Sequence, residues 1–318
     1  MGLYLVKVVN NLKIYYIVII LINFNLFAQN NFSFIILPDT QYYPSNKNGG
    51  TIEIFKAQTK WIVEKKNDLN IVFVAHLGDV VQDQNIYESQ WEKSSEAMSI
   101  LENRQYTMLN DGIPYGIALG NHDVTNSQPG ESEYFNKYFG INRFSNRSYY
   151  GGHYGDTNDN HYILFSAGSI NFIAIFIEWH KDPTSDRFKS ILSWAKAILN
   201  EYSDRQAIII AHSIIYWDLN SFSRQGVALY NGIKEHTNAF LMLSGHVYPG
   251  EKLISNIYDG RTIHTLLSNY QHYSNGGNGF LRIMEFSPRN KKISVKTYSP
   301  YINEYETDDN SQFSIPWD

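Results

Sequence analysis

Polar side chains that can bind metal ions follow five apolar stretches of this sequence, at the point where each stretch ends. They are Asp39 after residues 34–37, Asp79 after 71–77, Asn121, His122 and Asp123 after 115–119, His212 after 207–211, and His246 after 240–243. Oxygen and imidazole ligands suit Zn, Mn, Fe, Mg or Ca, and the lack of cysteine excludes thiolate ligation. One such residue alone is better explained as a helix cap, a turn residue or a hydrogen-bonded histidine. Five in series predict a metal centre.

The apolar stretches that precede these residues are mostly continuous, which is typical of strands covered on both faces. Between them, apolar residues recur at helical spacing in segments 52–66, 87–102 and 185–202, the last with Ser185 as its expected N-cap. Alternating strands and helices predict an α/β layered domain, in which ligands gather at the carboxyl ends of strands. The last third of the chain consists mostly of strand-like segments, which predict a second sheet or an antiparallel extension. The glycine-rich segment 275–279 predicts a hairpin turn.

The order Asp39-x-Gln41, Gly78–Asp79, Gly120–Asn121–His122–Asp123, His212 and Gly245–His246 resembles the calcineurin-like metallophosphoesterase superfamily. The resemblance covers the chain from Asp39 to at least His246, and stretches 37–43 and 266–271 are similar to the secreted bacterial branch. It implies an α/β domain over residues 29–318, folded as a four-layer α/β/β/α sandwich. It also implies two divalent or mixed-valence metal ions (Mn, Zn or Fe). The implied activity is hydrolysis of phosphate mono- or diesters, with a hydroxide shared by both metals as nucleophile.

The same resemblance implies a role for each strand-end residue. Asp79 would bridge both metal ions and Asp39 would bind the first. The second ion would be held by Asn121, His212 and His246. His122 would lie near the leaving group, where its protonated form could donate a proton to the departing oxygen, and Asp123 would orient its ring.

Two positions depart from the family pattern, and both belong to the first metal site. Gln41 stands where the family usually has a histidine, and its amide oxygen is a neutral, weaker ligand. Tyr248 stands where the family closes its last motif with a second histidine. Tyr248 is either a hard phenolate ligand or a residue that packs beside the site, where water or Gln41 fills the shell. We therefore expect uneven occupancy of the two sites.

Residues 1–28 have the composition of a signal peptide. Lys7 and Lys13 precede the apolar run 14–22, and Ala28 ends the segment before a polar stretch. The alternative is a membrane anchor, but the run is shorter than the roughly 20 residues that a spanning helix needs. We expect a secreted or periplasmic protein with no stable membrane span after cleavage.

The amino-acid composition restricts the classes of binding partner. The net charge of −5, without a block of like charge, argues against a nucleic-acid-binding protein, which would carry a basic stripe. We expect a small-molecule or other phosphoester substrate.

Two alternative functions are also compatible with the sequence. Gln41 and Tyr248 favour a binding protein that has kept one metal but lost turnover, and the many tyrosines and asparagines would suit a glycan-associated accessory protein.

Five further histidines are interpreted mainly as structural. His76 lies within an apolar stretch, and His153 and His161 lie in a region expected to be a polar loop. His180 and His272 follow strand ends, so each could instead line the substrate pocket.

Overall fold

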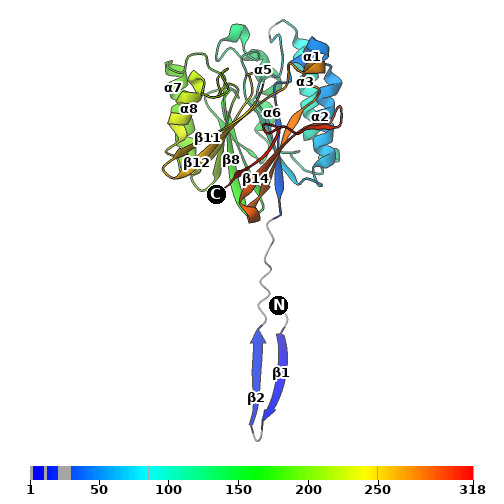
Figure 1. Cartoon of the computed structure of the whole chain (residues 1–318), viewed down its shortest axis with the longest axis vertical. Helices are drawn as coiled ribbons and strands as arrows, with labels where there is room; N and C mark the ends of the chain where they lie inside the picture. The colour runs from blue at the N-terminus through cyan, green and yellow to red at the C-terminus, as the bar shows by residue number, and fades with distance from the viewer. Residues whose placement is uncertain (1–2, 11–12, 21–29, 85, 249, 318) are drawn as a thin grey trace.

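The structure, a computed structural model, describes residues 3–10, 13–20, 30–84, 86–248 and 250–317. The predicted signal peptide, residues 1–28, falls partly outside these ranges. Its described parts are β1 (Leu3–Asn10) and β2 (Lys13–Ile20), which pair only with each other and lie apart from the main body (Figure 1). Among the described helices, none is both long and apolar enough to cross a membrane. The signal peptide stays a prediction.

Two seven-stranded sheets form the centre of the protein. The β8 sheet contains, in spatial order, β11 (Gly250–Tyr258), β12 (Arg261–Asn269), β10 (Ala239–Ser244), β9 (Gln206–Ala211), β8 (Ile170–Ile177), β7 (His161–Ala167) and β6 (Tyr150–His153). The β3 sheet contains β15 (Glu304–Glu306), β14 (Lys292–Ser299), β13 (Leu281–Ser287), β3 (Phe32–Leu37), β4 (Ile71–His76) and β5 (Tyr115–Ile117), with β16 (Gln312–Pro316) paired to β14.

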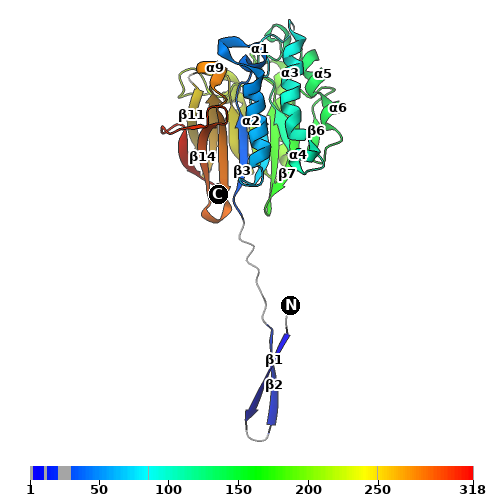
Figure 2. The same ribbon diagram turned by 90° about the vertical axis from the view of Figure 1, so that its right-hand side faces the viewer.

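Helices cover the outer face of each sheet, which confirms the four-layer α/β/β/α sandwich. The longer ones are α2 (Ile52–Lys65) and α3 (Glu88–Ser99) beside the β3 sheet, and α7 (Asp186–Glu201) and α8 (Arg224–Ile233) beside the β8 sheet (Figures 1 and 2). The shorter ones are α1 (Tyr42–Ser45), α4 (Arg104–Thr107), α5 (Glu133–Phe139), α6 (Ile141–Phe144) and α9 (Ser274–Gly277). The expected cap of α7 is confirmed, because the Ser185 hydroxyl accepts a hydrogen bond from the Phe188 amide.

Aromatic side chains fill the space between the two sheets. Phe34 of the β3 sheet meets Phe172 of the β8 sheet edge to face, with ring centroids 5.3 Å apart, and Phe73 stacks on Phe165 at 4.6 Å. Along β8 the side chains alternate, so that Phe172 faces this layer while Ile173 packs under α7 and α8. Strands buried on both faces explain the continuous apolar stretches of the sequence.

The strand directions bring the predicted ligands to one edge of the sandwich. β3, β4 and β5 run parallel in one sheet, and β8, β9, β10 and β12 run parallel in the other. The remaining strands extend both sheets in antiparallel fashion, as expected for the last third of the chain. The carboxyl ends of the parallel strands are where ligands collect in α/β sheets.

Two local predictions are wrong. The segment 275–279 is not a hairpin turn, because it joins β12 of one sheet to β13 of the other. It crosses there in a tight turn with positive φ at Gly277, where an added Cβ would lie 2.7 Å from the Tyr43 hydroxyl. His153 and His161 are not in a loop. His153 ends β6 and pairs with His161, which begins β7, is buried and stacks on Phe176 at 4.6 Å.

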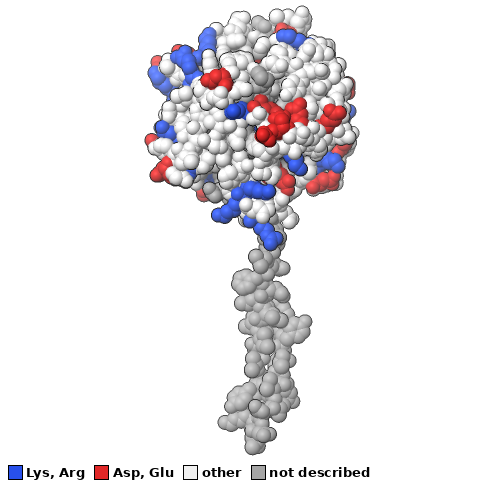
Figure 3. All heavy atoms as spheres, viewed as in Figure 1, with Lys and Arg blue, Asp and Glu red and all other residues white. Residues whose placement is uncertain are grey.

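The surface facing the viewer in Figure 3 has mixed charge. Acidic side chains gather in one patch there, while basic side chains are scattered and form no stripe on that face (Figure 3).

Candidate metal centre

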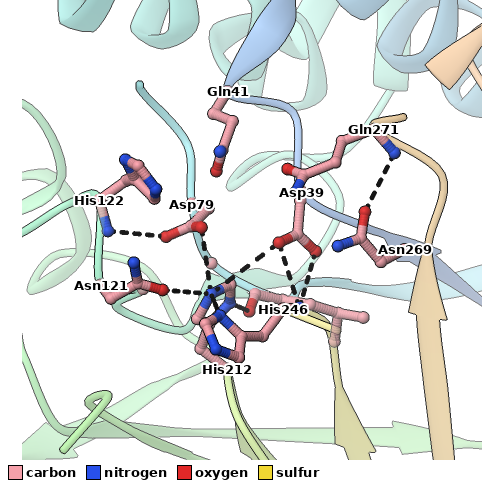
Figure 4. Close-up of polar contacts among 12 residues, drawn as sticks. Asp39, Gln41, Asp79, Asn121, His122, His212, His246, Asn269 and Gln271 are labelled. Atoms are coloured by element: carbon pink, nitrogen blue, oxygen red, sulfur yellow. Dashed lines mark hydrogen bonds and ion pairs between the residues drawn. The ribbon is translucent and has the colours of Figure 1, made fainter. Parts of the chain in front are cut away.

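The strand-end residues of both sheets meet in one polar cluster (Figure 4). Asp39 follows β3, Asp79 follows β4 and the Asn121 loop follows β5, while His212 and His246 follow β9 and β10 of the other sheet. Asp39 and Asp79 are each 2% exposed and His212 is fully buried. Burial of two carboxylates beside an imidazole is costly unless a cation or a proton balances them.

Four potential ligand atoms surround the Nε2 atom of His212. It lies 3.1 Å from Asn121 Oδ1, 3.2 Å from Asp79 Oδ2, 3.2 Å from His246 Nδ1 and 3.9 Å from Asp39 Oδ1. The other ring nitrogen of His212 lies 2.9 Å from the Leu77 carbonyl oxygen, which can only accept, so Nδ1 carries the hydrogen. In the neutral ring, Nε2 therefore directs its lone pair into the cluster, as a metal-binding histidine requires.

Two of the motif glycines, Gly120 and Gly245, are explained by close packing around the carboxylates. A Cβ on Gly120 would lie 2.2 Å from Asp79 Oδ1, and one on Gly245 would lie 2.3 Å from Asp39 Oδ2. Asp79 and His246 themselves have positive φ, 52° and 73°, a conformation that ordinary residues adopt at a cost. Backbone strain of this kind is typical of functional sites.

Main-chain amides from neighbouring motifs hold both carboxylates in place. The His246 amide donates to Asp39, at 3.1 Å to Oδ1 and 3.2 Å to Oδ2, and the His122 amide donates to Asp79 Oδ1 at 2.9 Å. Each motif therefore positions the ligand of another, which makes the cluster rigid before any ion binds.

The charges of the cluster strongly shift its pKa values. Burial raises the pKa of Asp39 to about 7 against the opposing effect of His212. Burial also acts on Asp79, but the charge and hydrogen bond of His212 outweigh it and hold the pKa of that carboxyl well below its usual range. Despite burial, Asp79 and Asp39 raise the pKa of His212 to about 9. A proton on His212 thus occupies the electrostatic place that a metal ion would take.

The side-chain amide oxygen of Gln41 shows whether the first metal site can accommodate a cation. Gln41 is 2% exposed, and its Nε2 donates to Gln82 Oε1 at 3.1 Å. Its Oε1 has no hydrogen-bond partner among the described residues. A buried acceptor without a donor costs about 1–3 kcal/mol, and a bound cation removes that cost. The residues present therefore fit a metal ion at this position.

Tyr248 lies outside the hydrogen-bonded cluster. Its side chain is 38% exposed, and its ring packs on His272 with centroids 4.3 Å apart. This placement agrees with the interpretation that Tyr248 packs beside the site. His272 also contacts the ring of Tyr42, which follows Gln41 in the chain. His180 contacts Ser185 and the Asp182 amide and supports the start of α7.

The structure differs from the expected role of Asp123. Its carboxylate accepts hydrogen bonds from the amides of Val80 and Gly120 at 2.8 and 2.9 Å, and it joins the Asp79 loop to the Asn121 loop. Among the described contacts none links it to the His122 ring. That ring is instead held by the main-chain oxygen of Gln82, 2.9 Å from Nδ1. Asp123 therefore orients loops rather than the imidazole, because strand-end carboxylates readily accept main-chain amides.

Three residues near the cluster are missing from the sequence prediction. Gln82 contacts both Gln41 and His122. Asn269 is the last residue of β12 and Gln271 comes just after it, beside Asp39 (Figure 4). The rule that found the other ligands also applies to β12, because polar residues follow its apolar stretch. Only the position of β12 next to β10 shows that its end reaches the same cluster.

Comparisons with known proteins agree with this geometry. The model of the calcineurin-like phosphoesterase family matches residues 32–249. The Bacillus subtilis (strain 168) protein YvnB is 33% identical over 304 residues, which are 92% of this chain but only 22% of YvnB. A dimetal phosphatase from Danio rerio, 11% identical, superposes with a TM-score of 0.56 over 90% of this chain and 99% of its own. The purple acid phosphatase PPD1 of yellow lupin (Lupinus luteus), 13% identical, also has a TM-score of 0.56, over 91% of this chain and 54% of its own.

Proposed function

The chain belongs to the calcineurin-like phosphoesterase family, and we propose that it is a two-metal hydrolase that cleaves phosphate mono- or diesters. The observation that carries this proposal is the convergence of Asp79, His212 and His246, whose ligand atoms lie within 4.8 Å of one another, next to the unpartnered oxygen of Gln41. A centre of this composition is suited to divalent cations.

The side chains divide into two ligand groups with Asp79 between them. Asn121, His212 and His246 would hold one ion, and Asp39 with Gln41 would hold the other. When bound, such ions would neutralise charge on the phosphoryl oxygens and would lower the pKa of a water so that it can act as the nucleophile. The chain's own contribution is to fix these ligands through the amides of His122 and His246 before substrate arrives.

His122 is placed to handle a proton in this reaction. Its Nδ1 is held by Gln82, at 2.9 Å from the carbonyl oxygen and 3.2 Å from the side-chain Nε2 of that residue, so the His122 Nε2 is the ring atom left to transfer a proton. Its main-chain amide contacts Asp79, so the ring is anchored next to the bridging carboxylate. We assign His122 to protonation of the leaving oxygen.

An exposed aromatic side chain beside the centre favours substrates with a planar or apolar leaving group. Trp217 is 54% exposed, and its ring lies 5.5 Å from that of His246. An exposed ring beside a ligand offers a surface for stacking. Aryl esters are therefore suitable first substrates for a test.

The test uses purified protein stripped with a chelator and reloaded with Mn, Zn or Fe. We expect turnover of p-nitrophenyl phosphate or bis(p-nitrophenyl) phosphate that depends on added metal and is lost in Asp79→Asn. Protein that binds metal but turns over neither ester with any of these ions would support the alternative of a binding protein without activity.

We also propose that residues 1–28 direct secretion. The support is the order of Lys7, Lys13, the apolar run 14–22 and Ala28. N-terminal sequencing of protein from culture medium or periplasm should begin near Gln29. An unprocessed N-terminus in a membrane fraction would instead identify an anchor.

A further inference from the structure

A second unpartnered amide oxygen lies on the first-metal side of the centre. Gln271 is 8% exposed, and its Oε1 is buried without a hydrogen-bond partner among the described residues. Figure 4 shows its side chain reaching from the end of β12 toward Asp39. Buried acceptors are almost always satisfied in folded proteins, so two in one place, on Gln41 and Gln271, indicate a missing positive group.

The main chain around Gln271 is held firmly. Its amide donates to Asn269 Oδ1 at 3.0 Å, and its carbonyl oxygen accepts from Asn48 Nδ2 at 3.5 Å. Because a main-chain N–H can only donate, the Asn269 oxygen must face Gln271. The Asn269 Nδ2, which has no partner in the described part of the chain, is then directed toward Asp39 (Figure 4). Asn269 thus positions Gln271 rather than competing with it.

Gln271 and Tyr248 are the two candidates for the ligand position that the family motif leaves open here. Tyr248 is 38% exposed and packs on the ring of His272. Gln271, the neighbour of His272 in the chain, is the buried member of the pair and carries the unpartnered oxygen. Burial and an unmet acceptor both favour Gln271, because a ligand atom must face the ion and not the solvent.

We propose that Gln271 completes the ligand shell of the first metal ion, which makes that half of the centre an all-oxygen site. This inference rests on the proposed two-metal function. Asp39, Gln41, Gln271 and the shared Asp79 offer only carboxylate and amide oxygens, whereas the other half includes two imidazoles. Oxygen ligands select hard cations such as Mn²⁺, Mg²⁺ or Ca²⁺, and imidazoles favour Zn²⁺. The protein should therefore load two different metals.

Metal competition tests this inference independently of activity. The full chain, stripped of metal, is equilibrated with equal concentrations of Zn²⁺ and Mn²⁺, separated from free ions, and analysed by inductively coupled plasma mass spectrometry. We expect one Zn and one Mn for the native protein. Gln271→Ala should keep its Zn and bind Mn at least tenfold more weakly, while Gln271→His should take up two Zn, because it adds an imidazole to the oxygen site.

Two further variants separate the candidates. Tyr248→Phe, which removes only the phenol oxygen, should keep both metals, and Gln105→Ala, an exposed glutamine on α4, is the matched control. If Gln271→Ala folds poorly by circular dichroism, Gln271→Glu should still bind Mn at least tenfold more tightly than the native protein. The inference about Gln271 would be overturned if Tyr248→Phe lost Mn while Gln271→Ala kept it, or if the native protein bound two Zn. Neither result would contradict the proposed function. Native protein that binds no metal would overturn the proposed function with it.

Discussion

Among the residues that the structure describes, two clusters bring three potential ligand atoms within 4.8 Å of one another, yet they are built in opposite ways. The first is Asp79, His212 and His246, and the second, the C-terminal acidic cluster, is Glu251, Glu306 and Asp308. In the first, buried acceptors around the ligands lack partners. In the second, side chains of the protein itself already donate hydrogen bonds to the carboxylates.

The donors of the acidic cluster come from one buried arginine and several hydroxyls. Arg282 is fully buried and its Nη2 lies 3.0 Å from Glu251 Oε1, which also accepts from the Tyr270 and Thr297 hydroxyls at 2.6 Å each. The Ser311 hydroxyl contacts both Glu251 and Asp308. Proximity of carboxylates is therefore a poor sign of a metal site, and unmet acceptors are a better one.

The largest effect should come from breaking the first cluster at its shared ligand. Asp79→Asn removes the charge that both proposed ions need, so we expect kcat/KM to fall at least about a thousandfold, or about 4 kcal/mol of transition-state stabilisation. Steady-state kinetics with an aryl phosphate would measure it. Glu306→Gln in the acidic cluster is the matched control and should keep full activity. Equal losses in both variants would remove the distinction between the clusters.

Breaking the acidic cluster should lower stability rather than activity. Arg282→Met leaves Glu251 buried without its cation, which typically costs about 3–5 kcal/mol. Urea unfolding followed by circular dichroism would measure the free energy of unfolding, and the folded fraction should keep its metal content. A loss below about 1 kcal/mol would show that the hydroxyls alone satisfy Glu251.

Metal removal should change the Tm differently in variants of the two clusters. An ion that binds only the folded state at a hundred times its Kd stabilises that state by about 2.7 kcal/mol, so a chelator should lower the Tm of the native protein. Glu306→Gln should show the same decrease on chelation. Asp79→Asn should show little change, and a full decrease in that variant would place the metal elsewhere.

The smallest effect should be a pH dependence that belongs to the acidic cluster. Burial, followed by the charges of Glu251 and Asp308, raises the pKa of Glu306 to about 7. The folded state therefore holds a proton that the unfolded state has lost. The stabilisation from protonated Glu306 is complete below pH 4.5, the ordinary value, and is lost as the pH rises to about 7.

Glu306→Gln keeps the neutral form at every pH. The variant should exceed the native protein in stability at pH 8 by about 1–2 kcal/mol, reduced by solvent screening, and match it near pH 4. Chemical unfolding at the two pH values would measure this difference. A difference of equal size at both would assign the effect to packing instead of charge.

Much of the fold and of the metal centre could be predicted from the sequence. Continuous apolar stretches predicted strands covered on both faces, because burial on both faces leaves no polar side. The glycines before Asp79, Asn121 and His246 marked the motifs, since Gly120 and Gly245 leave space that a Cβ would fill. The hairpin expected at 275–279 was wrong, because a glycine-rich turn does not encode which sheet the next strand joins.

The sequence by itself determined the types of ligand and their places at strand ends, because local sterics and hydrophobic burial act on neighbouring residues. Only the tertiary structure decided which ends meet. Asn269 and Gln271 reach Asp39 because β12 lies beside β10, while Asp39 follows β3 of the other sheet. Strand order depends on the packing of whole sheets across the aromatic layer, and no local pattern carries it. The same packing gave Glu251 its arginine and left Gln41 and Gln271 unpartnered.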